Sequence, residues 1–199
     1  SVTTSTSIVG FPLESRICLA WTLMIMLIVF ILIIEFLIFV QLQQKDFYGA
    51  FIQSKSLDKR LNEDGQRMYE LAKLFVTNKQ WSVSKQCFDY LILKGPSNLF
   101  FDAATIDKLS VEFLSLTESS LTQREEFISL EVNLLKANEK YKNSYLSSVL
   151  IKDIASLKAY YLDKSSEAII LLEDYLLNNS LEIQLKAELK LMLADIYLI

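Results

Sequence analysis

The sequence offers few side chains that could carry out chemistry. It has 199 residues without a single histidine, and its two cysteines lie far apart, at Cys18 and Cys87. The lack of histidine excludes catalytic triads and dyads built on an imidazole base, and it also excludes histidine metal ligands. Two cysteines provide neither a disulfide framework nor a four-cysteine zinc site. These counts exclude most of the common catalytic and metal-binding arrangements.

Adjacent acidic residues are the remaining candidates for acid–base chemistry. They occur as Glu125-Glu126 and as Glu173-Asp174. On a helix, neighbours in sequence point about 100° apart, so the two carboxyl groups of a pair do not face one another. No phosphate-binding loop, dinucleotide fingerprint, zinc-protease motif, calcium loop or nucleophile elbow is present. We therefore predict that the protein is not an enzyme and has no catalytic residue, metal or cofactor.

A long apolar stretch near the N-terminus has the length of a membrane span. Ile17 to Ile34 contains no charged residue, and apolar character continues to Val40, with Glu35 as the only charge. As a helix, Ile17–Val40 would extend about 36 Å, more than the roughly 30 Å hydrocarbon core of a bilayer. A cleaved signal peptide would have a shorter apolar region and a small-residue cleavage site. We predict a transmembrane anchor at 17–40, after a short tail at 1–16.

Basic residues on the two flanks predict the orientation of this anchor. Arg16 precedes the span, and four basic residues follow it, namely Lys45, Lys55, Lys59 and Arg60. Cytoplasmic flanks carry the excess of Lys and Arg, so we expect the C-terminal part on the cytoplasmic side, or on the stromal side in a plastid. The richness in Leu, Ile, Lys and Asn is compatible with a plastid thylakoid membrane or a bacterial inner membrane.

Glu35 is the one charged residue within the predicted span, and it has two interpretations. A carboxylate in hydrocarbon costs several kcal/mol unless it is paired, protonated or close to the interface. In the first interpretation, Glu35 reaches the headgroups, or the true span is shifted toward the N-terminus. In the second, Glu35 pairs within the membrane with an Arg, a Lys or a cofactor of a partner.

The rest of the chain predicts an all-α fold. Only 4 glycines and 2 prolines occur, too few for the many turns of a sandwich or barrel. Apolar residues recur at helical spacing, which predicts a polar helical linker at 41–63 and seven helices in a domain at 64–199. Short connections between helices favour antiparallel neighbours. These connections are expected at Asn78–Gln80, Lys94–Phe100, Ser119–Thr122, Asn138–Asn143, Asp163–Ser165 and Asn178–Leu181.

The distribution of charge bears on the kind of partner. Residues 45–94 hold nine basic and six acidic side chains, whereas residues 95–199 hold ten basic and sixteen acidic ones. The basic part lies next to the predicted anchor and suits an anionic membrane surface. The acidic part argues against nucleic acid as a partner. We expect the bilayer, through Ile17–Val40, and other proteins as the partners.

One 34-residue window, Gly65–Asn98, has the layout of a helix-pair repeat. Large, small and aromatic residues stand at the spacing of such a pair, at Met68, Leu71, Ala72, Phe75, Ser84, Phe88, Leu91 and Pro96. This pattern resembles the tetratricopeptide repeat, with Leu91 as the clear departure from a small residue. The end of the chain is similar again, with Leu193, Ala194 and Tyr197 at positions 7, 8 and 11 of a first repeat helix. A weaker match covers Ala155 to Leu172, and the region 105–142 matches poorly.

The resemblance implies an α-solenoid of antiparallel helix pairs with a concave groove that binds other proteins. In that family, positions 2, 5, 9, 12 and 13 of each first helix line the groove. Transferred to this chain, they are Gln66, Tyr69, Lys73, Val76 and Thr77 in the first repeat, and Glu188, Leu191, Asp195, Leu198 and Ile199 in the last. The last repeat has only its first helix. We expect that helix to be a cap, or the domain to be truncated there, or a partner to cover it.

An anchor followed by repeats predicts a membrane-anchored scaffold or assembly factor for a membrane protein complex. The plan is similar to that of plastid and cyanobacterial assembly proteins for photosystem I, and to anchored repeat adaptors of bacterial envelope biogenesis. The alternative is a constitutive accessory subunit of a large photosynthetic or respiratory complex, with a structural role.

Overall fold

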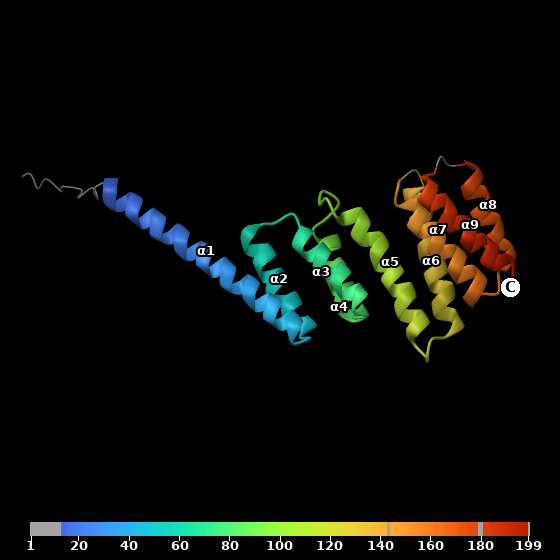
Figure 1. Ribbon diagram of the computed structural model, residues 1–199, viewed down its shortest axis with the longest axis horizontal. Coiled ribbons are helices and arrows are strands. Elements are labelled where there is room, and N and C mark those ends of the chain that lie inside the picture. The colour runs from blue at the N-terminus through green and yellow to red at the C-terminus, as the bar shows by residue number, and fades with distance from the viewer. Residues whose placement is uncertain (1–12, 143, 179–180, 199) are drawn as a thin grey trace, which may run out of the picture. The chain divides into compact units, whose positions relative to one another are not determined.

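The computed structural model describes residues 13–142, 144–178 and 181–198. Over these residues the chain is all-helical, with nine helices and no strand, which confirms the predicted fold class at this level (Figure 1). The chain divides after Leu61 into two compact units. We call them the N-terminal hairpin (α1 and α2) and the C-terminal unit (α3 to α9). The helices are α1 Leu13–Gln43, α2 Phe47–Leu61, α3 Gln66–Thr77, α4 Trp81–Leu93, α5 Phe101–Glu118, α6 Arg124–Tyr141, α7 Ser147–Tyr161, α8 Ser165–Asn178 and α9 Ile183–Tyr197.

The helix α1 is long and apolar enough to cross a membrane over Ala20–Gln43. Length and composition alone are also met by buried core helices and by N-terminal signal sequences. In this chain only 6% of the apolar window is buried, so α1 is not a helix enclosed by the protein's own core. Residues 1–12 of the expected tail at 1–16 lie outside the described residues. The remaining residues, from Leu13, belong to α1.

The helix α2 packs on α1 where sequence alone indicated a polar linker. α1 continues to Gln43, a turn follows, and α2 then contacts α1. Ile34 and Ile38 are the two buried side chains in the described part of α1, each with 8% exposed. Phe51 and Leu57 of α2 are buried as well. The linker is helical, as expected, but it carries an apolar face of its own.

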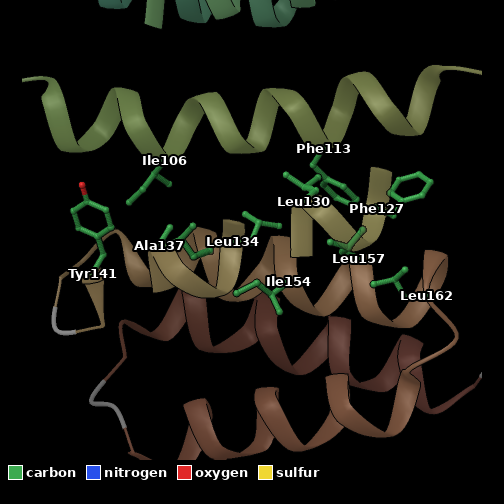
Figure 2. Close-up of a cluster of buried hydrophobic side chains, with 11 residues drawn as sticks. Ile106, Phe113, Phe127, Leu130, Leu134, Ala137, Tyr141, Ile154, Leu157 and Leu162 are labelled. Atoms are coloured by element: carbon green, nitrogen blue, oxygen red, sulfur yellow. The ribbon is translucent and has the colours of Figure 1, made fainter. Parts of the chain in front are cut away.

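In the C-terminal unit each helix contacts the next one along the chain, and α5 also contacts α7. One buried cluster joins α5, α6 and α7, where Ile106 and Phe113 of α5 face Leu134 and Leu157 (Figure 2). A second cluster joins α7, α8 and α9 around Ala155, Leu172 and Leu189. The partly buried Leu171 packs against both clusters. The amphipathic helices thus bury their apolar faces in two adjoining cores.

The two ends of α6 are set in different ways, one by local sequence and one by a tertiary contact. The helix α6 begins at a capping box, in which Gln123 and Glu126 satisfy each other's backbone N–H groups. The connection expected at Asn138–Asn143 is wrong in its first part, because α6 continues to Tyr141. Tyr141 is buried, and its hydroxyl donates a hydrogen bond to Asp102 of α5 at 2.6 Å. This tertiary contact holds the last turn of α6 in place.

Candidate partner-binding face

The best repeat match, α3 and α4, has its small residues at the point of closest approach. Ala72 and Ser84 are fully buried, and the Ser84 hydroxyl donates a hydrogen bond to the carbonyl oxygen of Ala72 at 3.1 Å. Phe75 and Phe88 are also fully buried. Small side chains allow two helices to approach closely, and the aromatic rings fill the space beside them. Ala72 and Ser84 therefore have the packing role that the motif assigns to them.

The groove candidates on α3 fall into two groups. Tyr69 and Lys73 contact α5, since the Tyr69 hydroxyl donates to Asp107 Oδ2 at 2.7 Å and Lys73 Nζ lies 3.4 Å from the same oxygen. Tyr69 also stacks on Phe100, with ring centroids 5.0 Å apart. The other three do not contact α5 in this way. Gln66 and Thr77 are exposed, and Val76 is half-buried.

The candidates on α9 share one exposed face. Glu188, Leu191 and Asp195 follow one another at helical spacing, and all three are exposed. Leu191 keeps 66% of its surface exposed, which is high for a large apolar residue. Leu198 is 87% exposed, whereas Ile199 lies outside the described residues. The small residue of the motif, Ala194, is exposed here and does not pack against a second helix as Ala72 does.

Polar contacts connect the odd-numbered helices in series. Asp107 of α5 binds Tyr69 and Lys73 of α3, and three residues further along α5 the Ser110 hydroxyl donates to Asp153 of α7. Lys152 of α7 then pairs with Glu188 of α9 at 3.2 Å. We call this set the polar row, consisting of Tyr69, Lys73, Asp107, Ser110, Asp153, Lys152 and Glu188. Its side-chain contacts join α3 to α5, α5 to α7 and α7 to α9.

Burial perturbs two ionisable groups of the polar row. Burial raises the pKa of the Asp153 carboxyl to about 6, and Asp107 adds to this effect, whereas Ser110 and Lys152 oppose it. Burial also raises the pKa of the Tyr69 phenol, and its hydrogen bond to Asp107 raises that pKa further. Tyr69 thus stays a neutral hydrogen-bond donor. Asp153 changes charge close to neutral pH.

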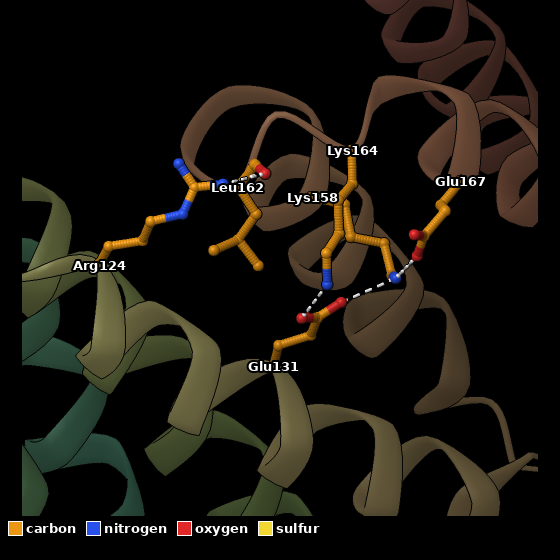
Figure 3. Close-up of polar contacts among 6 residues, drawn as sticks. All are labelled: Arg124, Glu131, Lys158, Leu162, Lys164 and Glu167. Carbon is orange, nitrogen blue, oxygen red and sulfur yellow. Dashed lines mark hydrogen bonds and ion pairs between the residues drawn. The ribbon is translucent and has the colours of Figure 1, made fainter.

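A second polar cluster, on α6 to α8, was not foreseen from the sequence. Glu131 is buried between two lysines, with Lys158 Nζ and Lys164 Nζ each 2.7 Å from one of its oxygens (Figure 3). Lys158 also pairs with Glu167. Burial raises the pKa of the Glu131 carboxyl, but hydrogen bonds from both lysines outweigh this, so the pKa is lowered. The cluster joins the middle of α6 to the last turn of α7 and to the start of α8.

The long-range partners in both clusters were missed because no motif contains them. Asp107 lies 38 residues from Tyr69, and Glu131 lies 33 residues from Lys164. A weaker signal was available. Glu131 and Lys158 interrupt otherwise apolar helix faces, and a charge at such a position needs a partner when it is buried.

The part of the chain that the structure describes offers no side-chain cluster for a metal ion, since no group of three or more His, Cys, Asp or Glu side chains in it could hold one. An open depression of about 400 Å³ at the start of α3 is lined by Glu63, Asp64, Gln66, Arg67 and Glu70. Its side chains bind one another, because Arg67 pairs with Glu63 at 3.0 Å and Gln66 donates to Glu70 at 2.8 Å. The face of α9 is the better candidate for binding a partner because it exposes the large apolar side chain of Leu191, although its Glu188 is already paired with Lys152.

Comparison with models of known protein families and with curated proteins finds no match for this chain. The resemblance to the tetratricopeptide repeat therefore rests on the residues of α3 and α4 and on the partial matches in α7 to α9, and it stays a prediction.

Proposed function

We propose that this chain is a membrane-anchored scaffold or assembly factor, in which a tetratricopeptide-like series of helix pairs holds a segment of another protein. The observation that carries the proposal is the polar row, which connects α3, α5, α7 and α9 one after another. In a solenoid of helix pairs, the first helix of each pair lies next to the first helix of the following pair. The polar row agrees with that order.

The exposed face of α9 supports a protein as the ligand. It combines the apolar Leu191 with the acidic Glu188 and Asp195. Interfaces between proteins typically have an apolar centre with charged groups at the rim. The lack of histidine in the sequence also favours binding over catalysis. The apolar helix α1, which is exposed along nearly all of its apolar window, would supply the anchor.

Partner retention after membrane solubilisation tests this proposal. We expect the amount of partner protein that co-purifies with the chain to fall at least tenfold in Leu191→Arg, because a buried charge at an interface centre is strongly unfavourable. Ile170→Arg on α8 is the matched control, since Ile170 is 59% exposed and Leu191 66%. Equal retention by both variants would contradict a binding role for the α9 face.

The same purification separates a scaffold from a constitutive subunit. A scaffold or assembly factor is expected to bind below one-to-one stoichiometry and to dissociate as ionic strength rises. Constant stoichiometry in one large complex throughout purification would instead favour the accessory subunit.

A further inference from the structure

Two contacts, one at each end of α2, show along which part of α1 this helix packs. Near the turn, Gly49 lies against Gln41, since a Cβ on Gly49 would be 2.6 Å from Gln41 Nε2. At the far end of α2, the guanidinium of Arg60 lies over the Phe30 ring, 5.1 Å from its centroid. The two helices therefore run antiparallel from Gln41 to Phe30, over about 16 Å of helix rise.

The packing of α2 on this part of α1 limits where a bilayer can lie along α1. Phe30 is near the middle of the apolar window Ala20–Gln43. If hydrocarbon covered that whole window, the last turn of α2, with Lys59 and Arg60, would lie close to the bilayer centre. Each basic side chain is disfavoured there by roughly a hundredfold. Both of these side chains are exposed on the hairpin, so the protein does not shield them from lipid.

A boundary nearer the N-terminus reduces this cost, because the basic end of α2 then lies about one turn from the headgroups and no longer at the bilayer centre. Ile17–Ile34 has no charged residue and would extend about 27 Å, close to the thickness of the hydrocarbon core. Just beyond it, Phe36 and Phe39 remain 67% and 55% exposed, and such rings suit the interfacial layer. Glu35 is half-buried and lies at this boundary, on the stretch of α1 that α2 follows.

The basic end of α2 then lies close to the boundary, with Arg60 level with Phe30, about 6 Å of helix rise inside it. Lys59 and Arg60 are in its last turn, and Lys55 is one turn earlier, with its ammonium 5.4 Å from the Phe51 ring centroid. Side chains on a helix lean toward its N-terminus, which for α2 is the direction away from the bilayer centre. Long basic side chains can therefore reach the headgroup layer while their stems remain in apolar surroundings.

We propose that the membrane boundary lies at Ile34–Glu35 and that the basic end of α2 (Lys55, Lys59 and Arg60) binds the phosphates of anionic lipid headgroups. The inference rests on the proposed membrane anchor and adds its position and its lipid class. A basic residue next to an anionic leaflet strengthens association by about fivefold.

Depth-dependent quenching tests the boundary in the full chain. With Cys18→Ser and the buried Cys87 left in place, an environment-sensitive fluorophore is attached at Leu37→Cys or at Leu27→Cys in vesicles of phosphatidylcholine and phosphatidylglycerol. We expect position 37 to be quenched mainly by a spin label on the headgroup, and position 27 by a label deep in the acyl chain. Stronger deep quenching at position 37 would overturn the boundary. Loss of the protein from vesicles in an alkaline wash would instead contradict the anchor itself.

Lipid selectivity tests the basic end. For the reconstituted wild type, we expect spin-labelled phosphatidylglycerol to be enriched around the protein by at least fivefold over phosphatidylcholine at low salt. The double variant Lys59→Gln with Arg60→Gln is expected to lose most of this preference. Lys186→Gln with Lys190→Gln on α9 makes the same charge change and is expected to keep it. A wild type without preference, or a K59Q/R60Q protein that retains it, would overturn the lipid-binding role.

Discussion

At the scale of single residues, the two polar clusters determine how the C-terminal unit responds to substitution and to pH. Asp153 and Glu131 are both acidic and both sit between helices, yet their pKa values move in opposite directions. Asp153 has one hydroxyl donor, from Ser110, and burial dominates. Glu131 has a lysine on each oxygen, and pairing dominates. Two ammonium groups on one carboxylate outweigh burial at Glu131, whereas Ser110 and Lys152 do not outweigh it at Asp153.

Removing the charge of Glu131 should destabilise the C-terminal unit. Glu131→Gln leaves the buried Lys158 with Glu167 as its remaining acidic partner, and breaking a buried pair costs about 3–5 kcal/mol. We expect a loss of about 2–4 kcal/mol in the free energy of unfolding, measured by urea unfolding of the full chain in detergent at neutral pH. Glu139→Gln on the same helix is exposed and should change it by less than about 0.5 kcal/mol. Similar losses in both variants would argue against a special role for Glu131.

Removing the charge of Asp153 should have the opposite effect and stabilise the protein at neutral pH. Its pKa is raised from 3.8 to about 6 in the folded protein, so its ionisation opposes folding. The free energy of unfolding is therefore not reduced by Asp153 below about pH 4, where the carboxyl is protonated in both states. It falls as the pH rises through 6, where the folded protein must ionise this carboxyl. Asp153→Asn should therefore be more stable than the wild type by about 1–3 kcal/mol at pH 7, and by nearly nothing at pH 4. Urea unfolding of both proteins at the two pH values measures this, and a pH-independent difference would contradict it.

At the scale of helices, the sequence predicts the number of helices and most of their boundaries, because the helical spacing of apolar residues is a local signal. Phe75, for example, belongs to a set of apolar residues that recur every three or four positions along α3, and Phe88 belongs to such a set on α4. The return of α2 onto α1 could not be predicted in this way. It depends on Ile34 and Ile38, which a hydropathy pattern cannot tell from their lipid-facing neighbours. The α6 end at Tyr141 was likewise decided by a partner on another helix.

The candidate site was predictable only in part, for the same reason. The groove candidates on α9 that the structure describes are exposed, as a binding face requires, whereas Tyr69 and Lys73 are bound to Asp107. A repeat motif specifies positions within one helix pair. It does not specify which side chains of the next pair will contact them.

The close approach of α3 and α4 gives a prediction at this scale. Ala72→Leu places three extra carbon atoms where Ser84 meets the α3 backbone, and overpacking of this kind costs about 1–3 kcal/mol. We expect a lower urea midpoint for the full chain, at an unchanged dependence on denaturant. Thr77→Leu places the same side chain at an exposed position of α3 and serves as the control. If Ala72→Leu unfolds like the wild type, the assignment of Ala72 to the contact position of a repeat is incorrect.

At the scale of the whole molecule, the chain combines an apolar helix with a larger all-helical unit. Under the proposed function, α1 would hold the binding surface of this larger unit beside a membrane. The basic end of α2 and the acidic, partly apolar face of α9 have different chemistry and so suit different partners. The proposed function therefore assigns the lipid to the first surface and a protein segment to the second.

The most direct test of the scaffold proposal is site-specific photo-crosslinking in native membranes. A photoreactive residue is placed at position 191 on α9 or, as the control, at position 170 on α8. We expect a discrete adduct from position 191, containing the same protein that co-purifies with the wild-type chain, and little or none from position 170. Equal adducts at both positions, or none at position 191, would contradict it.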